Sequence, residues 1–304
     1  MTTPLCLYHA NCADGACAAW VVRHRFPNAE CRAVSYDSPD YLIIPETRGR
    51  DVYVVDFSFS LKTMQAIART SRSLTVIDHH KTARDAIAEL VGFDGNDEWF
   101  NVGRHPAAIF DQGRSGAGLT WDTLFPWSPL PWFVAYVEDR DLWRWELPDS
   151  REVNAYIGSF PAGPDGFLFG VVLHGLHDAH HIGNAISEGR AILRVEDRMI
   201  DEICANARFA WPHLPGGVVV VTDRWPDGIP TVNTPVLRSE AAHRLAEGAP
   251  FAVAWYEDDD GNRRYSLRSD ENGLDVSEIA KAFGGGGHKH AAGFTIKKES
   301  KCAF

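Results

Sequence analysis

Short apolar runs alternate with segments of helical periodicity over the first ninety residues of the chain. The apolar runs cover residues 5–8, 52–55 and 74–77 and are rich in Val, Leu and Ile. Helical patterns cover residues 16–26 and 61–69, the second with a serine just before it that can serve as N-cap. This alternation predicts an α/β fold, a parallel sheet with helices on both faces.

Each predicted strand leads to side chains that can bind a metal. A further apolar stretch, residues 132–137, ends in the same way, and we predict it to be a fourth strand. Because ligands of open parallel sheets bind beyond the carboxyl ends of the strands, we expect these ends to converge on one place. In chain order, the side chains are His9 with Asp14, Asp56, Asp78 with His79 and His80, and Asp139.

The second half of the chain has a different pattern. Residues 187–209 are charged, rich in helix formers and free of proline, and this predicts a connecting helix. We predict an N-terminal domain over residues 1–185, a connecting helix within 186–213, and a smaller α/β domain with a mixed sheet over 214–304. The strands predicted in this last domain cover residues 218–221, 251–256 and 265–268.

Composition narrows the possible partners. With 304 residues, of which 45 % are hydrophobic, the chain can bury the cores of two folded domains. A net charge of -11 argues against a protein that covers long duplex nucleic acid with a basic face, whereas small anionic substrates can still bind through cations. No secretion signal follows Met1, no run is apolar enough to span a bilayer, and the six cysteines form no C-x-x-C pair. We therefore expect a cytoplasmic protein with reduced thiols.

The mixture of imidazoles and carboxylates indicates a transition-metal site. Such ligands suit Mn²⁺, Fe or Zn²⁺ better than Ca²⁺, and bridging carboxylates can hold two ions about 4 Å apart. Ions in this arrangement catalyse phosphoryl transfer. A single Asp at a strand end is more often the N-cap of the next helix, so the hypothesis depends on the convergence of all the strand ends.

A glycine run near the end of the chain is the second candidate site. Residues 284–287 are all glycine, and His288 follows them. Their backbone N–H groups can form an anion-binding nest, to which His288 can add a donor. The small residues at 291–293 predict that the run packs on a strand and is not a flexible linker. A helix is expected just before it, over residues 276–283, with Asp275 and Glu278 as a capping box.

Three other groups of residues allow more than one interpretation. We interpret Cys12 as a small neutral filler and not as a nucleophile, and Trp121 as a core residue. For Trp143 and Trp145, core packing and the stacking of a nucleobase are both open. A histidine series is interpreted as a solvated helix face and not as a zinc site; its members are His174, His177, His180 and His181.

Five motifs together resemble a known family. The phrases Y-H-A-N-C-A-D-G, V-V-D-F, I-D-H-H-K-T and V-E-D-R-D-L-W resemble the four motifs of the DHH phosphoesterase superfamily, in the right order. The glycine run, G-G-G-G-H-K-H-A-A-G, resembles the signature of the DHH-associated C-terminal domain. The motifs begin at residues 8, 54, 77, 137 and 284, so the resemblance covers nearly the whole chain.

The resemblance implies a two-domain hydrolase that uses one or two Mn²⁺ ions or other divalent cations. One ion would be held by His9, Asp14 and Asp56, and a second by Asp56, His79 and Asp139, with Asp56 as the bridge. His80 would face the substrate phosphate and Asp78 would support the imidazoles, so that the expected catalytic residues are His80, Asp78 and Asp56. The substrate would be clamped from the other side by the C-terminal domain, through Arg268, Gly285, Gly286, Gly287 and His288. For Arg268, an ordinary surface arginine is the alternative.

The first motif departs from the family pattern. Many members have a second carboxylate there, as D-x-D, whereas Cys12, Ala13 and Ala16 stand around Asp14 in this chain. One ligand is therefore missing, and the second ion would bind more weakly, take a water ligand instead or be absent, with Asn11 as a distant helper. In the fourth motif we predict Asp139 as the ligand in preference to Asp141.

The leading functional hypothesis is a metal-dependent phosphodiesterase or exonuclease. It would hydrolyse dinucleotides or short single-stranded oligonucleotides to mononucleotides, and its acidic charge suits a short substrate. A nucleoside bisphosphate phosphatase or a polyphosphatase using the same metals is the first alternative. The second is a nucleotide sensor that has lost turnover together with the missing carboxylate.

Overall fold

The computed structural model describes residues 3–35, 43–92, 99–100, 105–160, 163, 179–210 and 228–298. The chain forms two compact units, Met1–Leu193 and Arg194–Phe304. The strand predicted over residues 218–221 lies outside the described residues, as do His174 and His177, and nothing is described of the side chains of His180 and His181.

The first unit contains a largely parallel sheet. Its described strands have the spatial order β2-β1-β3-β4-β6-β5. Neighbours are parallel from β2 to β6, and the short β5 is antiparallel to β6, which confirms the predicted parallel-sheet fold. The strands are β1 (Leu5–His9), β2 (Glu30–Val34), β3 (Asp51–Val55), β4 (Ser73–Asp78), β5 (Trp99–Phe100) and β6 (Ala107–Phe110).

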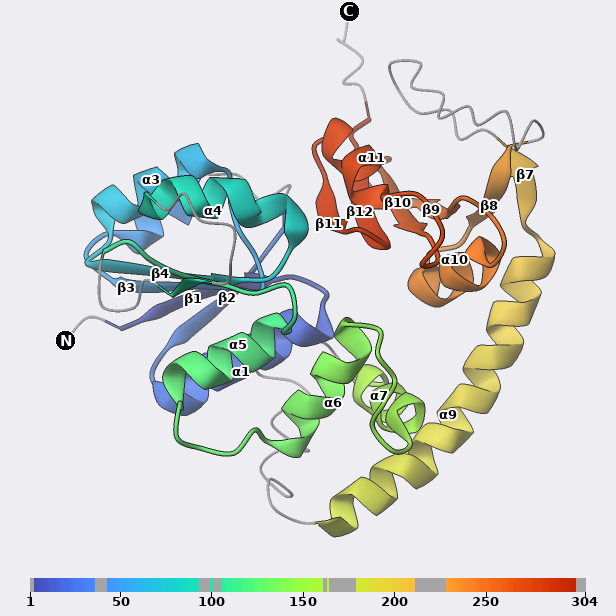
Figure 1. Cartoon of the computed structure of the whole chain (residues 1–304), viewed down its shortest axis with the longest axis horizontal. Coiled ribbons are helices and arrows are strands. Elements are labelled where there is room, and N and C mark those ends of the chain that lie inside the picture. The colour runs from blue at the N-terminus through green and yellow to red at the C-terminus, as the bar shows by residue number, and fades with distance from the viewer. Residues whose placement is uncertain are drawn as a thin grey trace, which may run out of the picture. The chain divides into compact units, whose positions relative to one another are not determined.

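Helices cover both faces of this sheet (Figure 1). Alternate side chains of a strand point to opposite faces, so Cys6 packs beneath one helical layer and Leu7 beneath the other. The Cys6 face carries α1 (Ala13–Arg25), α5 (Gly116–Leu124), α6 (Trp132–Asp141) and α7 (Ser150–Gly158). The Leu7 face carries η1 (Ile44–Thr47), α3 (Leu61–Thr70), η2 (Lys81–Ala83) and α4 (Arg84–Val91).

The prediction of a strand over residues 132–137 is wrong, because this segment is the start of helix α6. A short, continuous apolar run does not distinguish a buried strand from a buried helix by periodicity. Here Phe133, Val134 and Val137 form a stripe at helical spacing, and all three are buried in the core that α1 and α5 share. The carboxylates at the end of α6 are therefore presented by a helix terminus.

A long helix, α9 (Ala179–Ala205), runs from the first unit into the second. It begins earlier than the helix predicted over residues 187–209, and after it the chain enters β7 (Arg208–Ala210). Although it has 27 residues, its sequence is interrupted by charges. None of the helices in the described ranges is long and apolar enough to cross a membrane.

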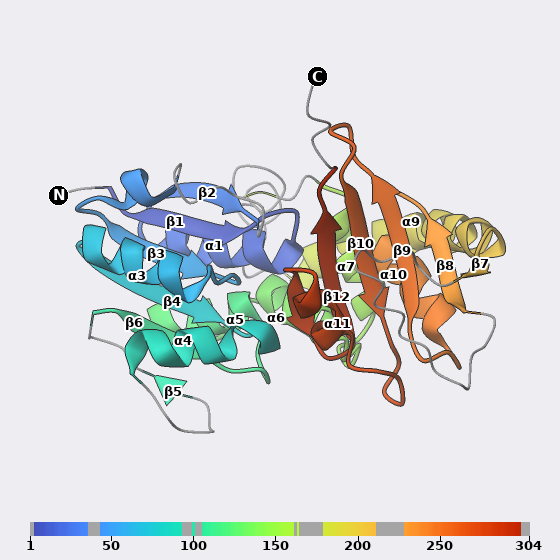
Figure 2. The same cartoon turned by 90° about the horizontal axis from the view of Figure 1, so that it is seen from above.

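The second unit contains a mixed sheet, as predicted (Figure 2). Its described strands have the order β11-β12-β10-β9-β8-β7, and among them only β8 and β9 are parallel neighbours. On β9, Val253 packs with α11 on one face and Ala254 packs with α10 on the other. The elements are β8 (Ile229–Asn233), α10 (Arg238–Ala246), β9 (Ala252–Glu257), β10 (Arg263–Arg268), α11 (Val276–Ala282), β11 (Gly286–His288) and β12 (Ala291–Ile296).

Candidate metal centre

The sheet order of the first unit fixes where a ligand can bind. Strand β1 lies between β2, which follows it in the chain, and β3, which lies on the opposite side of β1. Ligands of open α/β sheets bind beyond the carboxyl ends of the strands at such a switch point. His9 is the last residue of β1 and Asp56 directly follows β3, so both stand at the switch point.

One imidazole nitrogen lies at the centre of a group of carboxylates. The Nε2 atom of His79 is 3.1 Å from Asp56 Oδ1 and 3.5 Å from Asp141 Oδ2. It is also 3.8 Å from Asp14 Oδ2. On the other side of Asp56, His9 Nδ1 lies 3.4 Å from Oδ2. We call these five residues the acidic cluster; the fold gathers them from β1, α1, the end of β3, the end of β4 and the end of α6.

The backbone at Asp56 is held in an unfavourable conformation. Its φ of 51° is in the left-handed region, which costs energy for a residue other than glycine and is found mostly at functional sites. The Asp56 amide donates to Ile77 O at 2.9 Å, which ties the strained residue to the neighbouring strand. Gly116 packs against it so closely that a Cβ there would lie 2.5 Å from Asp56 Cβ.

The N-terminus of α5 holds the carboxylate of Asp14. Gly116 N donates to Asp14 Oδ2 at 2.6 Å and Ala117 N donates to Oδ1 at 3.0 Å. Backbone N–H groups at a helix N-terminus form a favourable site for an anion. Asp14 is 2 % exposed, so this support places it firmly in the interior.

A buried glutamate positions the same helix terminus. Glu138 Oε2 accepts from Ser115 N at 3.0 Å and from Arg114 Nε at 2.9 Å, and a Cβ on Gly118 would collide with it. Our sequence predictions missed this segment, R-S-G-A-G at residues 114–118. Its signal was a serine N-cap followed by two glycines in the first turn of a helix, where glycine indicates a close approach of the backbone.

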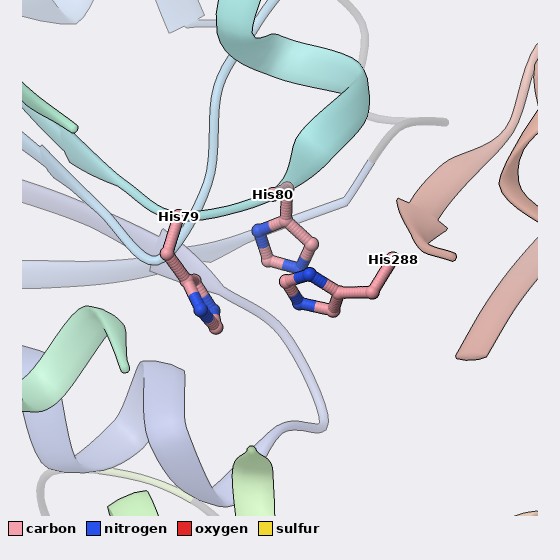
Figure 3. Close-up of side chains that lie close together, drawn as sticks. All are labelled: His79, His80 and His288. Atoms are coloured by element: carbon pink, nitrogen blue, oxygen red, sulfur yellow. The ribbon is translucent and has the colours of Figure 1, made fainter. Parts of the chain in front are cut away.

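Asp78 orients the two consecutive histidines and is not part of the acidic cluster. Its Oδ1 accepts from His79 N at 2.8 Å, His80 N at 3.2 Å and His80 Nδ1 at 2.7 Å. Its Oδ2 accepts from Ser58 Oγ at 2.6 Å. Figure 3 shows both imidazoles leaving the turn after β4, and their ring centroids are 4.7 Å apart. Asp78 thus contacts both histidines, and its supporting role in catalysis stays a prediction.

Burial and the neighbouring charges shift the pKa values of the residues in the cluster. Burial opposes charge on His79, but the Asp141 and Asp56 carboxylates outweigh it and raise the pKa of His79 to about 10. Burial also opposes ionisation of Asp56, yet hydrogen bonds from His79 and His9 hold its pKa well below the usual range. Burial, together with the charge of Asp56, raises the pKa of Asp14 and of Asp141. At neutral pH His79 of the metal-free cluster therefore carries a proton, which lies among the carboxylates.

The structure does not bring Asp139 into the cluster. Its carboxylate turns to the segment after α6, where it accepts from Glu146 N at 3.0 Å, from Leu147 N at 3.4 Å and from Ser150 Oγ. Asp141, two residues later and thus on another side of the helix, reaches His79 instead. The sequence-based preference for Asp139 over Asp141 does not fit this geometry. That preference assumed that residues 132–137 are a strand. In a strand, side chains two residues apart point to the same face, whereas in a helix they point to different sides.

The donor set fits a divalent cation. Asp141 Oδ2 is buried and accepts no hydrogen bond within the described part of the chain, a costly state for a carboxylate oxygen without a cation. Asp56 Oδ2 is also buried and has only the long contact with His9 Nδ1, at 3.4 Å. Ligand atoms of His9, Asp56 and His80, and likewise of Asp14, Asp56 and His79, lie within 4.8 Å of one another. Mixed imidazole and carboxylate ligands are those of Mn²⁺, Fe and Zn²⁺ sites.

Cys12 stands beside the cluster. Burial, followed by the charges of Asp56 and Asp141, raises the pKa of its thiol well above the ordinary value. A thiol in this state is a poor nucleophile, which agrees with its interpretation as a filler. Cys12 is the N-cap of α1, and its neighbour Asn11 has a φ of 55°, so the loop from β1 to α1 is also tightly bent.

The predicted substrate-binding residues lie in the second unit. Arg268 donates from Nη2 to Ser239 Oγ at 2.7 Å and from Nη1 to Leu267 O at 2.8 Å. Gly284 has a φ of 75°, and a Cβ on Gly285 would collide with Gly293 O on β12. The glycine run thus packs tightly on a strand, and its last two residues form β11 with His288.

The first unit is thus an α/β fold with a buried cluster of imidazoles and carboxylates at the switch point of its parallel sheet, and the donor set of this cluster suits a divalent cation. Comparison with known proteins shows what the chain is similar to. Residues 232–303 match the DHHA1 domain. The chain is similar to uncharacterized protein R106 of Acanthamoeba polyphaga mimivirus, 27 % identical over 97 % of this chain and 68 % of that protein. It is also similar to oligoribonuclease NrnB of Bacillus subtilis (strain 168), 26 % identical over 74 % of this chain.

The match spans 53 % of the length of NrnB, so the chain corresponds to about half of that protein. Among solved structures, RecJ of Thermus thermophilus in complex with Mn²⁺ is similar with a TM-score of 0.46 and 12 % identity, over 97 % of this chain and 49 % of RecJ. Residues 232–303 thus match the DHHA1 domain, and the similarity to these proteins agrees with the resemblance of the motifs to the DHH phosphoesterase superfamily.

Proposed function

We propose that this protein hydrolyses phosphodiester bonds of dinucleotides or short oligonucleotides and releases mononucleotides, with Mn²⁺ as the preferred cofactor. The observation that carries the proposal is the convergence of three carboxylates, those of Asp14, Asp56 and Asp141, on one nitrogen of His79. No hydrogen-bonding role explains this crowding, whereas a cation in place of the proton would relieve it.

The residues proposed to hold the ion are those of the acidic cluster. His9, Asp14 and Asp56 are retained from the sequence prediction, as is His79, and Asp141 replaces Asp139. A divalent ion there supplies charge neutralisation for the phosphate and lowers the pKa of a water molecule. The strained backbone of Asp56 and the amides of Gly116 and Ala117 keep the carboxylates in place before any ion binds.

His80 and Asp78 are proposed to act together on the substrate. Asp78 accepts the Nδ1 proton of His80 at 2.7 Å, which orients the ring and fixes its tautomer. Although burial opposes it, the charge of Asp78 raises the pKa of His80, so that the ring can donate a proton to a phosphate oxygen. In the second unit, Arg268, His288 and the amides of Gly285–Gly287 are proposed to bind the rest of the substrate.

Three observations support a short nucleotide substrate in the cytoplasm. The net charge of -11 disfavours long polyanions. One relative, NrnB of Bacillus subtilis, is an oligoribonuclease. The described cysteines are free thiols, namely Cys6, Cys12, Cys17, Cys31 and Cys204.

Product analysis tests the proposal. The protein is incubated with Mn²⁺ and a panel of dinucleotides, a nucleoside bisphosphate and polyphosphate, and the products are separated by chromatography. Nucleoside monophosphates from dinucleotides are the expected result. Release of inorganic phosphate from the bisphosphate or from polyphosphate would establish the phosphatase alternative. Nucleotide binding without any product, whichever divalent metal is added, would establish the sensor.

A further inference from the structure

Two tryptophans follow Asp141, the last residue of the acidic cluster, in the sequence. Asp141 reaches His79, and Trp143 comes two residues later, so its Cα lies within about 7.6 Å of that of Asp141. Trp143 and Trp145 are both partly exposed, and their rings are in an edge-on pair with centroids 5.1 Å apart. We call them the tryptophan pair.

The backbone of the pair is strained, as that of Asp56 is. Trp143 and Trp145 both have a φ of 56°, and bulky residues seldom adopt this left-handed conformation. Strain of this kind persists where surrounding contacts enforce it, and it is concentrated at functional sites. Packing of two apolar rings would not require it, because either ring could pack from an ordinary extended or helical backbone.

Asp139 enforces the conformation. Its carbonyl oxygen accepts from Arg144 N at 2.8 Å, and its carboxylate accepts from Glu146 N at 3.0 Å and from Leu147 N at 3.4 Å. Asp139 thus holds the segment that carries both rings through its carbonyl oxygen, and the residues that follow it through its carboxylate. This gives Asp139 a role as a positioning residue, distinct from the role of Asp141.

The tryptophan pair also has an unsatisfied donor. Trp145 Nε1 is buried and donates no hydrogen bond to any atom of the described residues. The Arg151 guanidinium lies over the same ring, 5.3 Å from its centroid. The buried indole N–H is out of reach of a ligand, whereas the exposed part of an aromatic ring can stack on any base.

We propose that the tryptophan pair is the nucleobase-binding platform of this protein. This inference rests on the proposed function, since it assigns the base of the same nucleotide substrate to residues beside the metal centre. A ring that stacks on any base gives little discrimination between bases, so the ligand class is any nucleotide with an intact base. Trp121 is excluded from this role because it is 6 % exposed within the core.

The test compares a dinucleotide with its abasic analogue, which has the same phosphodiester bond and lacks a base. Trp143→Ala and Trp145→Ala are expected to raise KM for the dinucleotide about ten- to one hundred-fold, the cost of a lost base stack, with a smaller change in kcat. The loss of kcat/KM on the dinucleotide should exceed the loss on the abasic analogue at least about tenfold. Trp127→Ala, at a residue 96 % exposed, is the matched control.

Two additions keep the test decisive. Trp143→Phe and Trp145→Phe preserve an aromatic face and are expected to retain most of the affinity, which separates stacking from a folding defect. If the wild-type protein hydrolyses neither substrate, the proposed function fails, and calorimetry with a nucleoside monophosphate then decides the platform by itself. The inference would be overturned if both variants lost kcat/KM equally on the dinucleotide and on the abasic analogue. It would also be overturned if Trp143→Ala and Trp145→Ala bound nucleotide as tightly as Trp127→Ala does.

Discussion

Two carboxylates two residues apart at the end of α6 behave in opposite ways. Asp139 accepts hydrogen bonds from two backbone amides and a serine hydroxyl, so its charge is fully accommodated. Asp141 has a buried oxygen that accepts no hydrogen bond within the described residues and faces the imidazole of His79. The same residue type is thus a structural anchor in one place and a candidate ligand in the other.

This difference shows how to separate the two roles in a crowded acidic region. A structural carboxylate has donors for its lone pairs, and removing it leaves those donors unsatisfied. A ligand carboxylate is crowded with other acids and lacks donors, and its removal relieves repulsion in the metal-free protein. The predictions below test this distinction at different residues, from the largest effect to the smallest.

The largest effect is expected at the centre of the cluster. His79→Ala and Asp56→Ala should each lower kcat/KM on a dinucleotide by about a thousandfold or more, because they remove groups that hold the metal. Asp85→Asn, at an exposed acidic residue on α4, is the control and should leave the rate unchanged. A rate within tenfold of wild type for His79→Ala would mean that the chemistry takes place elsewhere.

A smaller loss is expected when the scaffold of the cluster is disturbed. Gly116→Ala places a Cβ 2.5 Å from Asp56 Cβ, so Asp56 must move, and kcat/KM should fall about a hundredfold as catalytic geometry is lost. Gly183→Ala is the matched control, because a Cβ there meets nothing within 4 Å. In a helix interior it should raise the free energy of unfolding by about 0.5–1 kcal/mol and leave the rate unchanged. Steady-state kinetics and thermal melts measure both.

Stability should distinguish the two carboxylates of α6. Asp139→Ala leaves two part-buried amides and a buried hydroxyl without an acceptor, and the free energy of unfolding should fall by about 2–3 kcal/mol. Asp141→Ala should leave the stability of the metal-free protein unchanged or raise it. Urea denaturation with a chelator present measures both values. If Asp141→Ala were the more damaging of the two, the assignment of anchor and ligand would have to be reversed.

The pH dependence of metal binding follows from His79. Its pKa is about 10 in the metal-free protein, so a cation that binds Nε2 must displace a proton below that pH. Affinity should therefore rise about tenfold per pH unit for each proton released, until the pH approaches 10. Calorimetry in buffers of different ionisation enthalpy measures the proton release, and binding that does not change with pH would show that His79 is not a ligand.

Protonation of His79 has the opposite effect on the stability of the metal-free fold, which falls as the pH rises. A folded-state pKa that is raised above the unfolded value stabilises the protein at low pH. The contribution of His79 is therefore fully present below its ordinary pKa and is lost as the pH rises through about 10.

The strand ends were predictable from sequence, whereas the contribution of α6 was not. His9, Asp56 and His79 follow strongly apolar runs, and the parallel topology then brings them to one edge. The run at residues 132–137 has no polar residue to mark its periodicity, so nothing distinguished helix from strand or Asp141 from Asp139. The helix became visible only through its packing on α1 and α5.

The support around the cluster was also beyond the sequence pattern. Gly116 and Glu138 act through contacts with Asp56 and with the amide of Ser115, across large separations in the chain. Local patterning carries no information on such contacts. The left-handed backbone at Asp56 is similarly invisible, because aspartate gives no signal for strain that its neighbours impose.

The most direct test of the cation site is a titration of the metal-free protein with Mn²⁺ by calorimetry. The wild-type protein is predicted to bind at least one ion per chain, Asp141→Asn to bind it about tenfold or more weakly, and Asp139→Asn to bind it as the wild type does while folded. Equal Mn²⁺ affinity in wild type and Asp141→Asn, or a loss confined to Asp139→Asn, would contradict a metal centre built on His79, Asp56 and Asp141.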